Sequence, residues 1–268
     1  MTLEIFDSTG KLVRRFSSSD KPKVTEAELQ KELNVPTCWV RFPKILSAGA
    51  GMHRFVWDLH YPAPQSLRHE YPIAAIVHDT PRDPRGPRAL PGAYTVKLTV
   101  DGKSCQQPLT IKMDLRVQVT QAALAQQFAA ESKIAAEMNK DFAALQEVKR
   151  LREQLKKLAE QAGQGQLAET IATLDAKTAA LEGAVAPGEA FGPTTGQENL
   201  SRLNLELGTL YRAADSADAA PTTAQAAASA NLEKALASLL ARWDALKSHD
   251  LPALNQQLRA AGLTKITF

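Results

Sequence analysis

The strongest constraint on this chain is an abrupt change of sequence pattern near residue 119. The residues before that point hold 8 alanines and 11 of the 15 prolines, and those after it hold 36 alanines and 4 prolines. Proline-interrupted, alternating segments suit strands and loops, whereas alanine-rich segments with apolar residues every three or four positions suit helices. A chain of 268 residues has a length typical of two domains. We therefore expect a β-rich domain over 1–118 and a helical domain over 119–268.

Two hairpins are predicted in the first part. Every second residue is apolar in Ala93–Val100, and Asp101–Gly102, a favoured two-residue hairpin turn, follows at once. The segments Leu3–Phe6 and Lys11–Phe16 flank a second turn-forming stretch. These features are typical of antiparallel strands with one buried face.

A further strand is predicted at His53–Tyr61, where Phe55, Trp57 and Leu59 share one face. Several short strands without helices between them are typical of an antiparallel β-sandwich. Because Trp57 alternates with other apolar residues, we expect its ring to be buried in the sandwich core, although stacking on a carbohydrate is the alternative.

Residues 62–92 break the strand pattern with seven prolines in 31 positions. Proline fixes φ and cannot donate to a sheet, so this segment is predicted to be a long surface loop. Aromatic rings and loop arginines together suggest a ligand surface. The alternative is that the rings pack in the core and that the arginines are solvated charges. The candidate ligand-surface residues are Trp39, Tyr61, Arg82, Arg85 and Arg88.

The second part has helical periodicity, with apolar residues at steps of three and four. Helices are predicted over about Thr120–Ala162, from Leu167 to near Gly183, from Leu200 to Leu210, from Thr223 to Leu246 and over about Pro252–Ala261. A loop is expected over 184–196, and one helical turn is expected around Glu26–Leu33. Narrow apolar stripes rich in alanine favour close packing in an antiparallel bundle.

Composition excludes several classes of function. The 32 basic and 29 acidic residues leave a net charge of only +3, which does not indicate nucleic-acid binding. No apolar run approaches the roughly 18–20 residues needed to span a bilayer. Residues 1–16 contain acids and a turn, so no signal peptide is expected in this chain.

No motif for catalysis, cofactor binding or metal binding appears in the chain. Four of the five histidines fall between His53 and His78, but none has the spacing of a zinc motif. The two cysteines, Cys38 and Cys105, either form one disulfide or remain separate thiols, because spacing does not decide between these alternatives. We therefore predict no catalytic residue, no cofactor and no metal site.

Three sequence runs resemble one family. They are LEIFDSTGKLVRRFSS, AGMHRFVWDLHYP and LPGAYTVKLTVDGKSCQQPLTIKMDLRV, and they resemble the C-terminal region of bacterial sortilin-like, BNR-repeat β-propeller proteins commonly labelled glycosyl hydrolases. The runs ENLSRLNLELGTLYRAADSADAAPTTAQ and DLPALNQQLRAAGL are similar to the same region's tail. This sequence departs from the family pattern at Cys38, Cys105 and Leu115.

The resemblance implies an Ig-like or fibronectin type III-like sandwich followed by a helical bundle. It also implies an extracellular or periplasmic location, and it places any active site in a propeller that these residues do not contain. The expected function is a noncatalytic accessory module whose partner is the propeller, with a carbohydrate or protein as a further ligand. A carbohydrate-binding module and a free-standing glycoside hydrolase are the alternatives. The family pattern has a strand before LEIFD, so we expect the strand at Leu3–Phe6 to lie unpaired at a sheet edge.

Overall fold

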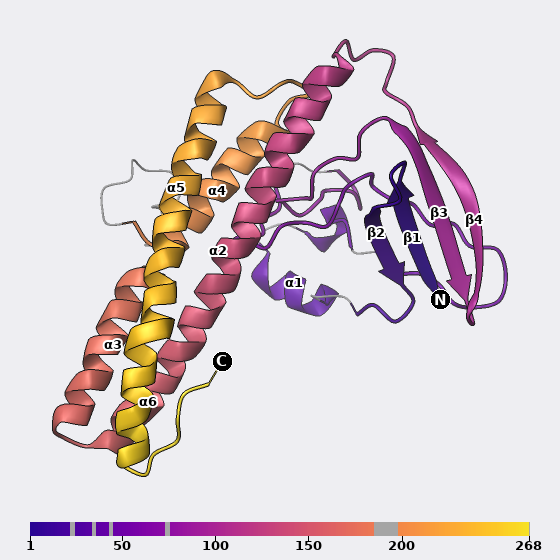
Figure 1. The fold of residues 1–268 in the computed structure, drawn as a ribbon. Coiled ribbons are helices and arrows are strands. Elements are labelled where there is room, and N and C mark those ends of the chain that lie inside the picture. Colours follow the sequence, from indigo (N-terminus) through magenta and orange to yellow (C-terminus); the bar gives the residue numbers. More distant parts are fainter. Residues whose placement is uncertain (22–24, 34–35, 43–44, 73–75, 185–197, 268) are drawn as a thin grey trace. The chain divides into compact units, whose positions relative to one another are not determined.

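The computed structural model describes residues 1–21, 25–33, 36–42, 45–72, 76–184 and 198–267. The chain contains one antiparallel sheet and several helices, and is therefore an α+β protein as predicted (Figure 1). It divides into two compact units. The sheet unit comprises Met1–Pro64, His69–Ser132 and Asp215–Pro221, and the helical unit comprises Gln65–Arg68, Lys133–Ala214 and Thr222–Phe268. The two compact units do not coincide with the predicted domains 1–118 and 119–268, because each unit contains residues from both ranges. The two domains therefore remain predictions.

The sheet has four strands in the order β2-β1-β3-β4, and all neighbours are antiparallel. The strands are β1 (Thr2–Asp7), β2 (Leu12–Ser17), β3 (Gly92–Val100) and β4 (Lys103–Ile111). Both predicted hairpins are confirmed. Asp101 and Gly102 have φ angles of 48° and 79°, the left-handed values that a two-residue hairpin turn requires.

The expectation that the first strand lies at a sheet edge is wrong. β1 is an inner strand that pairs with β2 on one side and β3 on the other. β3 returns alongside β1 with Leu3 opposite Leu98 and Ile5 opposite Val96. This pairing buries Ile5 in the core beneath the sheet, so the long-range partner, rather than a preceding segment, completes the ladder.

The strand predicted at His53–Tyr61 is also wrong. These residues form only an isolated bridge, at His60, and Leu59 adopts a left-handed φ of 63° with its side chain exposed. The alternation has a different cause, because the apolar rings of this segment pack against side chains of the sheet although the segment is not a strand. The Phe55 ring lies 4.7 Å from that of Phe16, and the Trp57 ring lies 6.2 Å from that of Tyr94. The described strands form one sheet, and a two-sheet sandwich is not confirmed.

Trp57 packs against the sheet core but is only partly buried, so the expectation of a fully buried ring is too strong. Its indole nitrogen donates a hydrogen bond to the His60 carbonyl oxygen at 3.0 Å. The buried apolar centre of the sheet unit consists of Ile5, Val13, Ala89 and Tyr94.

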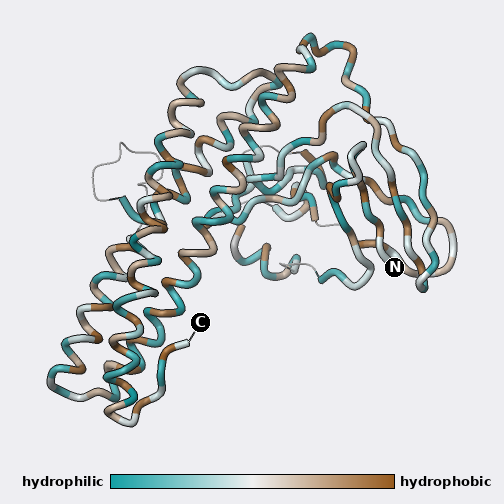
Figure 2. The backbone as a smooth tube through the Cα atoms, viewed as in Figure 1, coloured by the Kyte–Doolittle hydropathy of each residue, from teal (hydrophilic) through white to brown (hydrophobic). Residues whose placement is uncertain are grey.

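The helices follow the predicted ranges closely. They are α1 (Glu26–Glu32), the short η1 (Thr37–Trp39), α2 (Gln121–Ala162), α3 (Gln166–Glu182), α4 (Leu200–Asp215), α5 (Thr223–Ala245) and α6 (Leu251–Ala260). The Thr222 hydroxyl accepts a hydrogen bond from the Gln225 amide, and the Thr222 amide donates one to Oε1 of Gln225, which closes a capping box before α5. Hydrophobic and hydrophilic segments alternate along the helices (Figure 2).

The last two helices are continuous, contrary to the predicted separation. A π-helical turn, η3 (Leu246–Asp250), joins α5 to α6. Pro252 lies in the first turn of α6 and lacks an amide hydrogen, so the preceding turn widens without breaking the helix. Leu246, Leu251, Leu254 and Leu258 all reach the core of the helical unit.

Three further observations complete the fold. The loop predicted at 184–196 lies almost entirely outside the described residues. Cys38 and Cys105 are both free, exposed thiols, so the disulfide alternative is wrong. Among the helices that the structure describes, none is long and apolar enough to cross a membrane.

Candidate functional site

Three of the five predicted ligand-surface residues lie close together in the sheet unit. Tyr61, Arg85 and Arg88 gather around a buried histidine, His60, whose side chain is 4% exposed. We call the charged group around it the His60 cluster. Its members are His60, Asp83, Arg85, Arg88, Glu131, Asp215 and Asp218.

The other two predicted residues lie apart from this cluster. The backbone carbonyl of Trp39, in η1, accepts a hydrogen bond from the Thr80 amide at 3.0 Å. The Arg82 guanidinium donates to the His69 carbonyl oxygen at 3.1 Å. The five residues therefore do not form one surface.

A short antiparallel backbone pairing positions the cluster. The Tyr61 amide donates to the Pro87 carbonyl oxygen at 2.9 Å, and the Ala89 amide donates to the Leu59 carbonyl oxygen at 2.7 Å. Tyr61 also packs its ring 5.2 Å from the Phe128 ring. Burial raises the pKa of the Tyr61 hydroxyl to about 12, so this side chain stays neutral and acts as a packing group.

Both ring nitrogens of His60 are occupied. Nε2 lies 3.2 Å from Nη1 of Arg85, and Nδ1 lies 3.1 Å from the Gly86 carbonyl oxygen. A guanidinium can only donate, so Nε2 accepts and Nδ1 carries the hydrogen that is donated to Gly86. Burial lowers the pKa of His60 to about 4, and the neighbouring Arg85 acts in the same direction. His60 is therefore neutral at physiological pH.

The arginines of the cluster are paired with carboxylates. Arg85 lies 3.3 Å from Asp83 and 3.8 Å from Asp215, and Arg88 lies 3.6 Å from Asp218. These contacts tie the Pro-rich segment to the turn that follows α4. Burial raises the pKa of Asp215, while the charges of Arg85 and Arg88 oppose that rise.

Glu131, on α2, is the most deeply buried carboxylate of the cluster, at 2% exposure. Burial raises its pKa to about 7, although a hydrogen bond from Gln127 at 2.8 Å favours the ionised form. The Gln127 carbonyl oxygen in turn accepts from the Ala219 amide at 3.2 Å. The Glu131 carboxyl is thus enclosed by protein rather than open to a substrate.

Of the cluster members, only Arg85 and Arg88 are among the ligand-surface residues predicted from the sequence; the five others are His60, Asp83, Glu131, Asp215 and Asp218. Glu131, Asp215 and Asp218 lie 39 or more positions beyond the Pro-rich loop, and none of them belongs to a motif. Within the part of the chain that the structure describes, no three His, Cys, Asp or Glu side chains are arranged to hold a metal ion. Within the cluster, each of the two arginines lies within 4 Å of at least one carboxylate.

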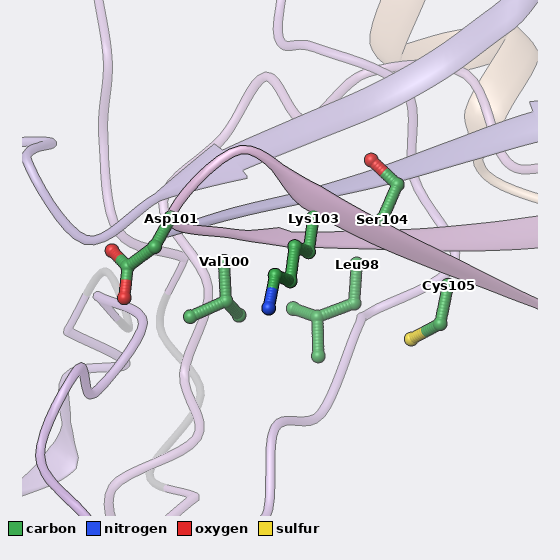
Figure 3. Close-up of a pocket in the computed structure, with 6 residues that line it drawn as sticks. All are labelled: Leu98, Val100, Asp101, Lys103, Ser104 and Cys105. Atoms are coloured by element: carbon green, nitrogen blue, oxygen red, sulfur yellow. The ribbon is translucent and has the colours of Figure 1, made fainter.

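A shallow hollow of about 400 Å³ lies at the free end of the β3–β4 hairpin. Figure 3 shows Leu98, Val100, Lys103 and Cys105 on one side of the ribbon, while Ser104 points to the other side. The lining combines apolar side chains with a single ammonium group and an exposed thiol. It contains no histidine and no second carboxylate beside Asp101, so it lacks an acid–base pair.

Comparisons with known protein families, with characterised proteins and with solved structures find no match for this chain. The family resemblance therefore rests on the sequence runs that carry it. The function must be inferred from the contacts in the sheet unit and the helical unit.

Replacing Gly86 by alanine should disrupt the His60 cluster. A Cβ atom on Gly86 would lie 2.1 Å from the Tyr61 carbonyl oxygen and 2.5 Å from that of Pro62, and both are backbone atoms that cannot move aside freely. We expect a loss of about 1–3 kcal/mol in the free energy of unfolding, as overpacking usually costs. Urea titration followed by the intrinsic tryptophan fluorescence measures this loss.

Gly49→Ala is the matched control, because a Cβ atom there would meet only the Ser47 hydroxyl at 4.0 Å. Its unfolding midpoint should equal that of the parent chain. Equal midpoints for Gly86→Ala and Gly49→Ala would show that the backbone pairing around His60 is loose.

Proposed function

We propose that this chain is a noncatalytic accessory and interaction module from the C-terminal part of a secreted sortilin-like, BNR-repeat β-propeller protein. In this proposal the sheet belongs to an Ig-like sandwich and the helices form an antiparallel bundle. The propeller is the partner, and the module acts outside the cell or in the periplasm. The observation that carries the proposal is that His60 and Glu131, the most buried titratable groups of the His60 cluster, make their hydrogen bonds within the protein.

A residue that transfers protons needs a free lone pair or a labile proton within reach of the substrate. His60 uses Nε2 to accept from Arg85 and Nδ1 to donate to Gly86. Glu131, whose pKa lies near 7, is 2% exposed and is held by Gln127. The groups with the most perturbed pKa values in the sheet unit therefore stabilise the fold, which favours a binding or structural role over turnover.

The positions of the family-like sequence runs support the same proposal. The first run forms β1 and β2, and the third forms β3 and β4. The second run contains Phe55 and Trp57, which contact the rings of Phe16 and Tyr94 on that sheet. The three runs meet in one packed unit, which supports treating them together as one structural signature.

The purified chain is expected to show no turnover of aryl-glycosides or sialosides, because glycoside hydrolysis requires two carboxyl groups set roughly 5–10 Å apart across a sugar-sized cleft. Release of the aryl group over an extended incubation measures this. Hydrolysis that disappears on replacement of a single Asp or Glu would refute the noncatalytic assignment.

The propeller partner is tested separately. Sequencing the DNA upstream of the Met1 codon should reveal in-frame propeller repeats, and the propeller expressed alone should bind this chain in calorimetry. A glycan array distinguishes the competing role, since glycan binding that is lost in Trp39→Ala would favour a carbohydrate-binding module. An upstream frame without propeller repeats would contradict the proposed context.

A further inference from the structure

β4 is an outer strand of the described sheet, because it pairs with β3 and with no other described strand. Its outward backbone groups can be identified from the hairpin register. Val100 and Lys103 flank the two-residue turn and form a hydrogen-bonded pair, and the pairs then alternate along the hairpin. Ser104, Gln106 and Pro108 consequently direct their backbone groups away from β3.

Two observations agree with this alternation. The Ser104 and Thr99 hydroxyl oxygens lie 2.8 Å apart, as expected where facing side chains approach closely in a non-hydrogen-bonded pair. Pro108 occupies one of the outward positions, where the missing amide hydrogen costs no bond to β3. Ser104 and Gln106 therefore present free amide and carbonyl groups along the outer edge.

Natural edge strands are usually protected by charge, proline, a bulge or shortness. In β4 the protection lies at Lys103 and at Pro108, and the four residues between them, 104–107, are uncharged. This open window is long enough for two hydrogen-bonded residue pairs. It carries no charge that would repel an identical strand.

An apolar row runs across the sheet and ends in this window. Cross-strand partners place Phe16 opposite Leu3, Leu3 opposite Leu98, and Leu98 opposite Cys105. Cys105 is exposed at the end of the row, beside the hollow in Figure 3. A strand that pairs with β4 must therefore bring a small apolar side chain opposite Cys105.

We propose that a second copy of this chain binds here, with the two β4 strands antiparallel about a two-fold axis at Cys105. Cys105 then faces Cys105 of the second copy, and Ser104 faces Gln106 in both directions. The two reciprocal pairs make four backbone hydrogen bonds, and the apolar row continues into the other sheet. Lys103 faces Gln107, so no like charges are opposed.

The symmetric register centred on Gln106 is blocked. Centring the axis on Gln106 would place Pro108 opposite Ser104 in a hydrogen-bonded pair, where the proline ring occupies the position of the required donor. A register that pairs an odd-numbered residue with an even-numbered one would bring the apolar face of one copy's sheet to the same side as the opposite face of the other copy's sheet. The axis at Cys105 therefore lets both outward residues, Ser104 and Gln106, pair with each other, whereas an axis at Ser104 would place Gln106 opposite Gly102 in the turn.

The first experiment measures self-association of the full chain by sedimentation equilibrium from micromolar to millimolar concentration. Gln106→Pro removes one outward donor from each copy without removing a bond to β3, so the dimer dissociation constant should rise roughly tenfold or more. Gln106→Ala keeps the donor and should dimerise like the parent chain. Circular dichroism verifies that both variants fold.

The second experiment tests the register with oxidised glutathione in a Cys38→Ser background. Two Cys105 thiols lose two protons and two electrons, forming one S–S bond, while one oxidised glutathione is reduced to two thiols. A non-hydrogen-bonded pair has a Cα–Cα distance of about 4.5 Å, which a disulfide spans. The parent chain should give a covalent dimer much faster than the Gln106→Pro variant does.

Register controls use a chain that also carries Cys105→Ser. Ser104→Cys alone, or Gln106→Cys alone, should crosslink poorly, since identical residues would then lie on a diagonal roughly 7–8 Å long. Mixing the two variants should restore crosslinking, because these positions face each other. A chain that stays monomeric at millimolar concentration, or a dimer insensitive to both Gln106→Pro and the crosslinking register, would overturn the proposal.

Discussion

Replacing Trp243 by alanine is expected to destabilise the helical unit by about 3–5 kcal/mol, as large aromatic deletions in cores do. The indole is 1% exposed, and its nitrogen donates to Glu147 at 2.8 Å. The Lys247 ammonium lies 5.3 Å from the ring centroid, so the deletion also removes a cation–π contact. Urea unfolding followed by the helical circular dichroism signal measures the loss.

Arg242→Ala is the control for Trp243→Ala, because this neighbouring side chain is exposed on the same helix. Its effect should stay within about 0.5 kcal/mol of the parent chain. Trp243→Phe should lie between the two, since it retains most of the apolar contact but loses the hydrogen bond to Glu147. An unchanged midpoint for Trp243→Ala would mean that the helices do not share one cohesive core.

The stability of the helical unit is expected to fall as pH rises from about 4 to about 7, because of Asp141. This carboxyl is 0% exposed, and burial raises its pKa to about 7. Asn204 donates to Oδ2 at 2.9 Å, while Oδ1 has no hydrogen-bond partner within the described residues. The folded state therefore keeps a proton that the unfolded chain releases near pH 4.

The sign of the effect follows from proton linkage. A pKa raised on folding contributes stability that is fully present at acidic pH and is lost as pH rises through the folded pKa. The loss for Asp141 amounts to about 4 kcal/mol, complete somewhat above pH 7. Asp141→Asn keeps an acceptor for Asn204 but cannot ionise, so its stability should lack this component.

Unfolding curves at several pH values between 4 and 8 test the Asp141 prediction. The difference between Asp141→Asn and the parent chain isolates this residue from the other buried acids, Glu131 and Glu137. Glu160→Gln is the control, because Glu160 is exposed on the same helix. A constant difference across the pH range would show that Asp141 titrates normally.

The hydrogen bonds of Asn204 are examples of contacts that sequence patterns do not predict. Its amide donates to Asp141, and its carbonyl oxygen accepts from the Leu67 amide at 2.8 Å. Nearby, Asn139 accepts from the Gln65 amide at 2.7 Å. The segment 65–68 thus belongs to the helical unit although it lies within the Pro-rich loop. Period and composition carry no information about such contacts, because they join positions more than sixty residues apart.

The candidate site also contains contacts that the sequence does not predict. Arg85 and Arg88 were chosen from the sequence because charge in a long loop is accessible to a partner, and the structure instead pairs them with Asp215 and Asp218. The pairing depends on the turn after α4 lying beside the loop. Whether an arginine binds a ligand or an internal carboxylate is therefore decided by folding and not by local sequence.

Local patterns were sufficient for the hairpins and the helices, because strand alternation, turn residues and capping boxes act over a few positions. Asp101–Gly102 and Thr222 are examples, since each sets an element boundary by its own backbone or hydrogen-bond preference. The same local reasoning is wrong at His53–Tyr61, because alternation indicates that one side of a segment is buried but does not identify the residues that bury it. Strand order, the inner position of β1 and the ion pairs of the His60 cluster depend on contacts between distant segments, and only the tertiary structure decides them.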